Sequence, residues 1–341
     1  MAFRVVKTAL MDILLPQMPP TPTPLKPESR AFLGTRRHVR PCPKPWRMTS
    51  SVIALLMTTA IAGCTSATTS AATSSTTSVA RGSGPVDVLY AGSLLDLMQQ
   101  QVDPAFAKAT GFTVSGYSAG STDLASEIKG RTQQGDVFIS ASPAVNTTLK
   151  GASNGNWVSW YVEFADSPLV LAYNPSSKFA HGLKTKPWYE VVDQPGFLLG
   201  RTDPATDPKG VLAVDALDQT ATKFSVPALR TEAASTTNVF PETTLVGRLQ
   251  AGQLDAGFFY GVEAAAAHLT VVPLVGTKLA GEYTVTILNQ APHEAAARAF
   301  VTFLLGAAGR KILKANGVDP ISPPKVTGKA SLPKSLKAAV Q

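Results

Sequence analysis

Cysteine is almost absent from this chain: among 341 residues, only Cys42 and Cys64 occur. Two cysteines form neither the framework of a disulfide-rich secreted domain nor the paired spacing of a zinc site. No cysteine follows Cys64, so the bulk of the chain holds no thiol that an oxidising compartment would attack. This absence suits an extracytoplasmic protein.

The chain also lacks a charge excess outside its first residues. The formal net charge is +8, but nine Lys/Arg residues precede Cys64 against only Asp12 and Glu28. The remainder carries 22 basic and 21 acidic side chains, so it is nearly neutral. A general electrostatic attraction to DNA, RNA or acidic membranes is therefore not supported, and we expect no nucleic-acid partner.

The apolar run at residues 51–63 (SVIALLMTTAIAG) is too short to cross a bilayer and has the length of a secretory signal core. It ends at Cys64 and resembles the lipobox of bacterial lipoproteins, in which the cysteine is acylated; a short buried helix that ends near a cysteine is the alternative. We predict a leader over 1–63, lipidation at Cys64 and a Ser/Thr/Ala-rich tether over 64–85. The protein would then be anchored on the outer face of the cytoplasmic membrane or in the periplasm. Residues 1–47 are also compatible with an over-extended gene start.

From Val86 on, short β-rich runs alternate with stretches of helical periodicity. Strands are predicted at 86–90, 112–115, 136–140, 168–173, 197–200, 256–260 and 283–288. Helices are predicted near 122–130, 210–218, 243–251, 262–268, 294–305 and 307–316. This alternation predicts an α/β fold with parallel sheets and helices on both faces. The Pro/Lys-rich tail, 323–341, is expected to be loose.

A near-repeat supplies the most informative motif: residues 90–94 read YAGSL and residues 118–122 read SAGST. Each follows a predicted strand and opens a predicted helix, with Ser93 and Ser121 expected at the N-cap. Helix starts offer unpaired N–H donors and the positive end of a dipole, which together favour an anion. Two such starts would converge at the carboxyl edge of a parallel sheet. Two ordinary N-caps without any ligand are the alternative interpretation.

The same stretch also matches the nucleophile elbow of α/β-hydrolases, because residues 116–120 read GYSAG with Ser118 at the centre. A secreted serine hydrolase is therefore a distant alternative. Only one strand precedes this motif, however, and no HGGG-like oxyanion loop occurs before it. The candidate histidines, His181, His268 and His293, lie in no recognisable catalytic setting, so we expect the protein not to be an enzyme.

Several short motifs occur in one order along the chain: 91–97 (AGSLLDL), 118–128 (SAGSTDLASEI), 135–141 (GDVFISA), 160–165 (WYVEFA), 169–173 (LVLAY), 188–192 (WYEVV) and 206–210 (TDPKG). Together they resemble the molybdate/tungstate-binding proteins of ABC importers, and in particular their tungstate/molybdate branch. The resemblance runs from about residue 86 to residue 317. It implies a two-lobed periplasmic-binding-protein fold of type II, with two crossover strands and the oxyanion in the interlobe cleft. Lobe 1 would comprise 84–168 plus 289–322, and lobe 2 would comprise 169–288.

The resemblance also assigns residues. Ser93 and Ser121 match the serines that hold oxyanion oxygens, Tyr260 matches the binding tyrosine, and Asp207 matches a carboxylate that approaches the metal in the tungstate branch. Residue 210 would open a helix whose amides face the anion.

The second carboxylate of that branch aligns with Thr244, and Glu242 lies two residues earlier. Asp207 and Glu242 are therefore the candidate direct ligands of molybdenum or tungsten, although from sequence we expect no anion-selective effect at Glu242. Lys209 is expected to be a solvated loop lysine.

The resemblance implies capture of molybdate or tungstate by a monomer that delivers it to an ABC permease and its ATPase, without a cofactor. Sulfate and ferric iron are the alternative ligands. Ferric-iron binders of this architecture are expected to use adjacent tyrosines, and the segment 258–261 (FFYG) contains only one.

Overall fold

The computed structural model describes residues 80–341, which lie within one compact unit of the chain. The predicted leader, the predicted lipidation site Cys64 and most of the predicted tether fall outside these residues. Among the helices of residues 80–341, none combines the length and apolar character that a bilayer-spanning helix needs.

Lobe 1 is built on a mixed sheet. Strand β1 (Pro85–Ala91) pairs in parallel with β2 (Thr113–Ala119) and with β3 (Val137–Ser140). Strand β9 (Ala280–Ile287) then runs antiparallel to β3 and to β4 (Tyr161–Tyr173), and β10 (Asp319–Thr327) pairs with β4 at the edge. The last four residues of β1 and all of β3 are buried, as expected for strands that helices cover on both faces.

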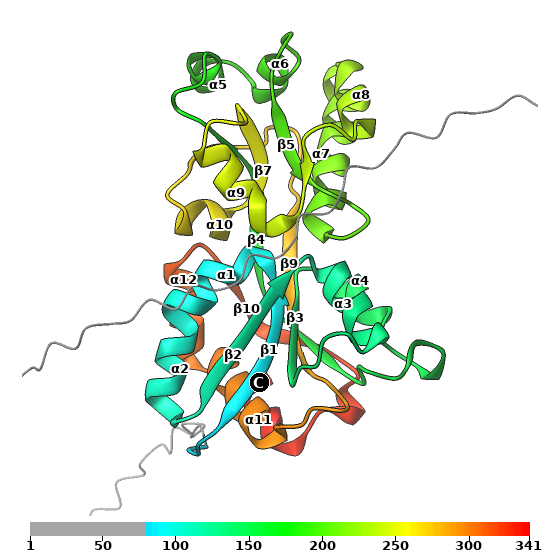
Figure 1. Cartoon of the computed structure of the whole chain (residues 1–341), viewed down its shortest axis with the longest axis vertical. Coiled ribbons are helices and arrows are strands. Elements are labelled where there is room, and N and C mark those ends of the chain that lie inside the picture. Colours follow the sequence, from blue (N-terminus) through cyan, green and yellow to red (C-terminus); the bar gives the residue numbers. More distant parts are fainter. Residues whose placement is uncertain (1–79) are drawn as a thin grey trace, which may run out of the picture. The chain divides into compact units, whose positions relative to one another are not determined.

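The helices of lobe 1 lie on either side of these strands (Figure 1). A continuous helical run contains a 3₁₀ turn (Gly92–Leu94), α1 (Leu95–Leu97), a π turn (Met98–Val102) and α2 (Asp103–Thr110). The others are α3 (Ser121–Gly130), α4 (Pro143–Thr147), α11 (Glu294–Leu305) and α12 (Ala307–Ala315). Helix α11 buries nine of its twelve residues, and eight of these belong to the main hydrophobic core.

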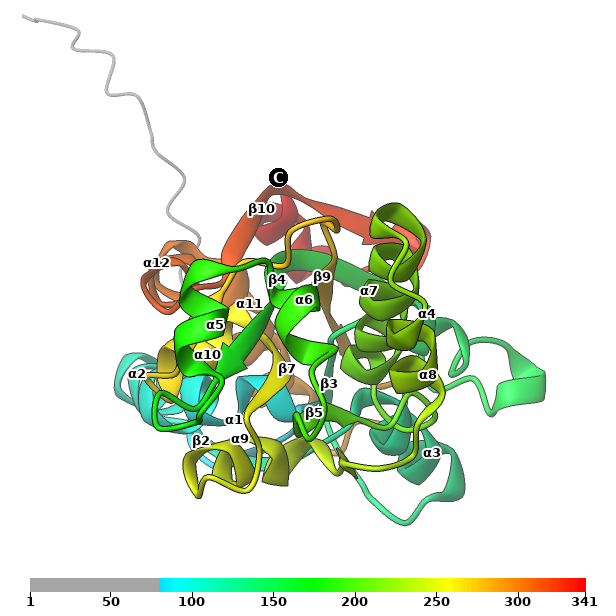
Figure 2. The ribbon, with the colours of Figure 1, turned by 90° about the horizontal axis from the view of Figure 1, so that it is seen from above.

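Lobe 2 has a smaller sheet in which β5 (Leu199–Thr202) runs parallel to β6 (Val239–Phe240) and β7 (Ala256–Tyr260). Strand β8 (Thr270–Val272) pairs with the end of β4. Its helices are α5 (Ala180–Thr185), α6 (Trp188–Val192), α7 (Pro208–Phe224), α8 (Ala228–Ala234), α9 (Glu242–Gln250) and α10 (Gly261–Ala266). Seen from the lobe 2 end, α7 and α8 lie on one side of the strands and α5, α9 and α10 on the other (Figure 2).

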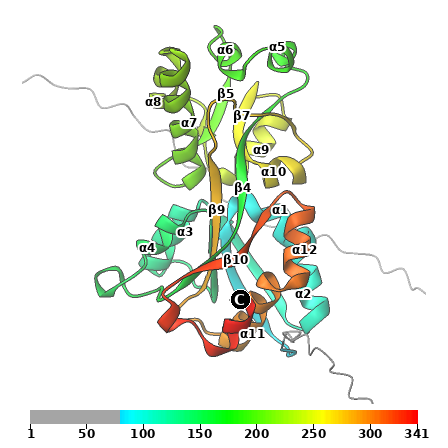
Figure 3. The same cartoon turned by 180° about the vertical axis from the view of Figure 1, so that it is seen from behind.

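Two strands connect the lobes, as predicted. Strand β4 pairs with β9 as far as Pro168 and with β7 from Leu169 onward, so it passes from one sheet into the other. Strands β4 and β9 run side by side between the lobes in Figure 3. The lobe boundaries at residues 168/169 and 288/289 stay a prediction. The names lobe 1 and lobe 2 refer to these predicted ranges.

Two expectations about the fold are wrong. The sheets are mixed rather than parallel, because both connecting strands run antiparallel to their neighbours. The tail is not loose: β10 continues to Thr327, and two 3₁₀ helices (Lys329–Ser331 and Lys334–Val340) follow. The prolines of β10 are tolerated because it is an edge strand, and Leu332, Leu336 and Ala339 are buried in the core.

Candidate functional site

The five residues assigned from sequence are brought to the ends of elements that face the other lobe. Ser93 and Ser121 directly follow β1 and β2, Tyr260 ends β7, and Asp207 and Glu242 stand at the starts of α7 and α9. The exposed fraction of each is 6% or less. Carboxyl ends of parallel strands are where α/β sheets bind ligands.

Each serine turn of lobe 1 lies against one carboxylate of lobe 2. A Cβ built on Gly92 would lie 2.7 Å from Oε2 of Glu242, and one built on Gly120 would lie 3.2 Å from Cβ of Asp207 and 2.4 Å from the carbonyl oxygen of Thr206. The two glycines are therefore required for close approach between the lobes. Gly120 has an ordinary φ of −56°, so close approach rather than backbone conformation accounts for the glycine.

The two serines are not N-caps, which corrects the sequence prediction. Ala91 and Gly120 occupy the N-cap positions, and neither helix start has a side-chain capping bond. The Ser121 hydroxyl oxygen instead accepts the Ala141 N–H at 3.0 Å, so its own proton remains available for a ligand.

Ser93 shares a hydrogen bond of 2.9 Å with the phenol of Tyr283, a residue that sequence reasoning missed. The rings of Tyr283 and Tyr260 meet edge to face with centroids 6.0 Å apart. In the sequence, Tyr283 is only the first residue of the strand predicted at 283–288, and no motif marks it as a site residue. The structure thus adds a second buried phenol to the site.

Lys209 is fully buried, so the prediction of a solvated loop lysine is wrong. Its Nζ lies 2.8 Å from Oε1 of Glu242 and 2.6 Å from Oε1 of Glu263. Glu263 was not singled out from sequence either; its other oxygen, Oε2, accepts the Tyr260 N–H at 2.9 Å. Helix α7 begins at Pro208, not near residue 210 as expected, and its first three residues, which include Lys209, are all buried.

Burial distinguishes Glu242 from Thr244, the residue that aligns with the second carboxylate of the tungstate branch. Glu242 is buried at the start of α9, whereas Thr244 is exposed and donates only to the carbonyl of Pro241. Glu242, although displaced by two positions from the aligned residue, is therefore the carboxylate that faces inward.

Three polar atoms of these residues are buried without a hydrogen-bond partner in the described part of the chain: the phenol oxygen of Tyr260, Oδ2 of Asp207 and Oε2 of Glu242. Such atoms cost free energy unless a ligand or water satisfies them. The other oxygen of Asp207 accepts the Lys209 N–H at 3.3 Å.

Burial controls the protonation of the site. It raises the pKa of Asp207 to about 7, and the negative charge of Glu242 adds to the rise. Burial also raises the pKa of Glu242 to about 7, although Lys209 opposes this. Burial alone would lower the pKa of Lys209, but the two glutamates outweigh it and the pKa is raised. The pKa values of Tyr260 and Tyr283 are raised well above 10.0, chiefly by burial, so both phenols remain hydrogen-bond donors.

The sequence predicted that the first backbone N–H groups of α3 would be free to bind an anion. In the structure they are already hydrogen-bonded. The N–H groups of Thr122 and Asp123 both donate to the carbonyl of Thr206, at 3.1 Å each. A residue of lobe 2 thus caps a helix of lobe 1, directly beside Ser121 and Asp207. The contact holds the two lobes together at the site.

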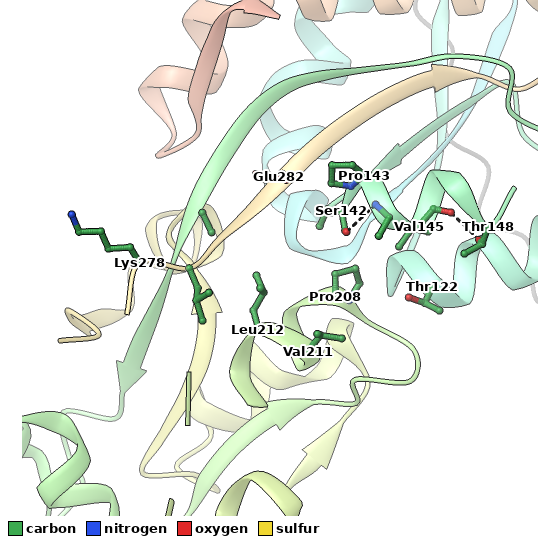
Figure 4. Close-up of a pocket in the computed structure, with 14 residues that line it drawn as sticks. Thr122, Ser142, Pro143, Val145, Thr148, Pro208, Val211, Leu212, Lys278 and Glu282 are labelled. Atoms are coloured by element: carbon green, nitrogen blue, oxygen red, sulfur yellow. Dashed lines mark hydrogen bonds between the residues drawn. The ribbon is translucent and has the colours of Figure 1, made fainter. Parts of the chain in front are cut away.

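A separate cavity of about 590 Å³ opens beside the site, between α4 and α7 (Figure 4). Val145, Val211 and Leu212 give it an apolar lining, and Thr122 and Pro208, which follow Ser121 and Asp207 in the chain, also line it. The three unpartnered site atoms belong to none of its lining residues. The cavity is therefore a different space from the buried polar site.

Comparison with known proteins decides the family. The model of the bacterial extracellular solute-binding protein family matches residues 86–319. The chain belongs to this family. Its members serve ABC transporters, so a permease and an ATPase are the general partners, and they are solute-binding proteins rather than enzymes.

Relatives with assigned ligands are distant. The molybdate/tungstate-binding protein WtpA of Thermococcus kodakarensis is 26% identical over 238 residues, which cover 54% of this chain and 67% of that protein. The periplasmic molybdate-binding protein of Azotobacter vinelandii superposes with a TM-score of 0.54 at 19% identity, covering 68% of this chain and 98% of that one. The sulfate-binding protein SubI of Mycobacterium tuberculosis gives a TM-score of 0.57 at 15% identity, covering 70% of this chain and 88% of that one. The solved structures confirm the two-lobed periplasmic-binding-protein fold.

The hydrolase alternative has no support in the geometry of this family member. Ser118 lies within β2, paired with Tyr90, rather than at the turn into α3. His293 contacts Asp136, with Nδ1 3.0 Å from Oδ2. The hydrogen bonds of residues 80–341 include none between Ser118 and a histidine.

Proposed function

We propose that this solute-binding protein captures molybdate or tungstate outside the cytoplasm and delivers it to an ABC importer. The observation that carries the proposal is the set of three buried, unpartnered atoms on Tyr260, Asp207 and Glu242, opposite the serine turns at Ser93 and Ser121. A small oxyanion would accept hydrogen bonds from the Tyr260 phenol and the serine hydroxyls, whereas the oxygens of Asp207 and Glu242, which are acceptors when ionised, would bond its central atom.

The carboxylates favour a metal-centred oxyanion over sulfate. A carboxylate beside a dianion is repulsive unless it is protonated or bonds the central atom. Molybdenum and tungsten can accept further oxygen ligands, whereas the sulfur of sulfate does not readily do so. Because Glu242 is buried and one of its oxygens is free, we now assign it, with Asp207, as a direct ligand, and we expect an anion-selective effect at both positions.

Ferric iron is the second candidate, and one observation favours it. Tyr260 and Tyr283 lie side by side, although the sequence suggested only one tyrosine, and Asp207 and Glu242 supply hard oxygen donors. Against iron, Tyr283 is engaged with Ser93, and burial opposes the phenolates that ferric iron prefers.

A thermal-shift panel on the purified protein tests the proposal, with molybdate, tungstate, sulfate, phosphate and ferric citrate as ligands. A ligand at a thousand times its dissociation constant adds about 4 kcal/mol to the free energy of unfolding. We expect large shifts with molybdate and tungstate only. A shift with ferric citrate alone would transfer the assignment to iron. A shift with sulfate alone would show that the carboxylates do not select molybdate or tungstate over sulfate. A serine-directed covalent probe in parallel would label Ser118 only if the hydrolase alternative held.

We further propose that the mature protein is a monomer held at the membrane by a lipid on Cys64. The signal-like run before this residue and the Ser/Thr-rich tether after it support the anchor. The near-neutral charge of the remainder fits a protein that depends on a lipid rather than on surface charge for attachment.

A further inference from the structure

Lys209 is the one lysine or arginine with no exposed surface among residues 80–341. A buried ammonium is tolerated only where opposite charges satisfy it. Here Glu242 and Glu263 do so, at 2.8 and 2.6 Å. The side-chain exposed fractions of the two glutamates are 2% and 6%, so water screens these ion pairs little.

The two oxygens of Glu242 have different environments. Oε1 is held by Lys209, whereas Oε2 has no hydrogen-bond partner and lies 2.7 Å from the position that a β-carbon on Gly92 would occupy. Without the lysine, the Glu242 side chain could rotate about its three side-chain bonds. Either carboxylate oxygen could then point away from the YAGSL turn of lobe 1. The ion pair therefore selects the orientation in which one oxygen points across the cleft.

The far side of Lys209 is anchored in turn. Glu263 binds the lysine through Oε1 and the backbone N–H of Tyr260 through Oε2. A chain of charged hydrogen bonds thus runs from the backbone of Tyr260 through Glu263 and Lys209 to Glu242. It links two of the proposed ligand residues, at the end of β7 and the start of α9, through a side chain on α7.

We propose that Lys209 is a positioning residue that, together with Glu263, aims Oε2 of Glu242 at the central atom of the bound oxyanion and so sets the preference for molybdate and tungstate over sulfate. This inference rests on the proposed function. It assigns to Lys209 no contact with the ligand; the lysine acts through Glu242.

Two simpler roles would leave other signatures. If Lys209 contributed only positive charge, its removal would weaken every dianion alike, since Coulomb attraction does not distinguish sulfate from tungstate. If it only stabilised lobe 2, its removal would lower the melting temperature but not the ratio of affinities. Only the positioning role changes that ratio.

The experiment measures the affinities of the purified protein for tungstate and sulfate by titration calorimetry, and the number of oxygen neighbours of bound tungsten by X-ray absorption. Lys209→Met is expected to weaken sulfate only through the lost Coulomb attraction, and to weaken tungstate by about tenfold or more beyond that, the scale of a lost interaction with a charged group. Bound tungsten should lose one oxygen neighbour. Lys223→Met, at an exposed lysine of the same helix, is the matched control and should change neither anion.

A second variant separates position from charge and guards against misfolding. Lys209→Met/Glu263→Gln removes one positive and one negative charge, so the net charge equals that of the wild type, and the glutamine can still accept the Tyr260 N–H. The inference expects tungstate binding to stay weak in this variant. Recovery of tungstate affinity, equal weakening of both anions in Lys209→Met, or an unchanged tungsten neighbour count would overturn it. Failure of the wild type to bind either anion would overturn the proposed function itself, and this inference with it.

Discussion

Single hydrogen bonds decide what the site can offer a ligand. The oxygen of Ser121 already accepts the Ala141 amide, so a ligand receives only the hydroxyl proton. Ser93 shares its hydrogen bond with Tyr283, so whichever hydroxyl donates in that pair leaves the other proton for the anion. Ser121, Tyr260 and one hydroxyl of the Ser93–Tyr283 pair therefore act toward the cleft as neutral donors, which suits an anion that must be fully paired once buried.

Ser121→Ala is expected to weaken oxyanion binding by roughly 1.5–3 kcal/mol, the scale for a hydrogen bond to a charged group. It should also lower the stability of the ligand-free protein, because the buried Ala141 amide loses its acceptor and not because a helix loses its cap. Calorimetry with molybdate and a urea titration measure the two effects. Lost stability with unchanged affinity would reduce Ser121 to a structural residue.

Asp207→Asn tests direct contact with the metal. The asparagine can still accept the Lys209 amide, so the start of α7 should be preserved. We expect weaker tungstate and molybdate binding, with sulfate unchanged or slightly stronger, since a negative charge is removed. If all three anions respond alike in calorimetry, Asp207 is a helix cap and not a ligand.

The ligand-free protein should become less stable as pH rises from about 4 to about 7. The pKa of Asp207 is 3.8 in an exposed reference and about 7 in the fold, so within this window the native state holds more protons than the unfolded state. Stability then falls with increasing pH, and the fall ends above the folded pKa. Melting curves at pH 5 and pH 8 should show a larger difference for the wild type than for Asp207→Asn. Equal differences would mean that Asp207 does not titrate in this range.

At the scale of elements, the contact between α3 and the segment before α7 determines how closely the lobes approach. A β-carbon at position 120 would lie 2.4 Å from the Thr206 carbonyl, closer than such atoms come in folded proteins. The turn is part of the interlobe contact, so the added methyl group would act on closure rather than on the core of either lobe.

Gly120→Ala should therefore weaken tungstate, molybdate and sulfate to a similar degree, by roughly 1–3 kcal/mol if the clash behaves as ordinary overpacking. Gly247→Ala on α9 is the matched control, because its added β-carbon meets no atom within 4 Å. Titration calorimetry of both variants against the three anions measures the effect. Wild-type affinities in Gly120→Ala would show that the contact at Thr206 is not needed for binding.

Elements with a clear local pattern were predictable. Strand β7 and helix α11 match the predicted ranges 256–260 and 294–305, because each is bounded by turn residues and has an unbroken apolar pattern. The tail was not predictable, since its prolines indicate a loop and only pairing with β4 makes an edge strand of them.

The sequence predicted the proximity of the candidate residues better than their bonding. The YAGSL and SAGST turns lie against Glu242 and Asp207, yet the predicted N-cap role of the serines was wrong. Lys209, Glu263 and Tyr283 were missed or misread because their importance arises from partners 33 to 190 residues away in the chain. Such long-range pairs leave no local signal in one sequence.

At the scale of the whole molecule, the proposed anchor at Cys64 is separated in sequence from the proposed site residues by the predicted tether. Cys64→Ala should release the protein from membranes into a soluble extracytoplasmic fraction, because a single change removes the lipid attachment. Its affinity for molybdate should not change, since the described fold begins beyond the tether. Fractionation of cells followed by immunoblotting measures the release. A wild-type protein found wholly in the soluble fraction would contradict the anchor.

The central claim is that a tetrahedral oxyanion occupies the buried polar site between the lobes. The most direct measurement is a crystal structure of the protein with tungstate, with the metal located by its anomalous scattering. We predict one strong peak in contact with Ser93, Ser121, Tyr260, Asp207 and Glu242. A peak in the apolar cavity between α4 and α7, or no peak in the cleft at saturating tungstate, would contradict the account.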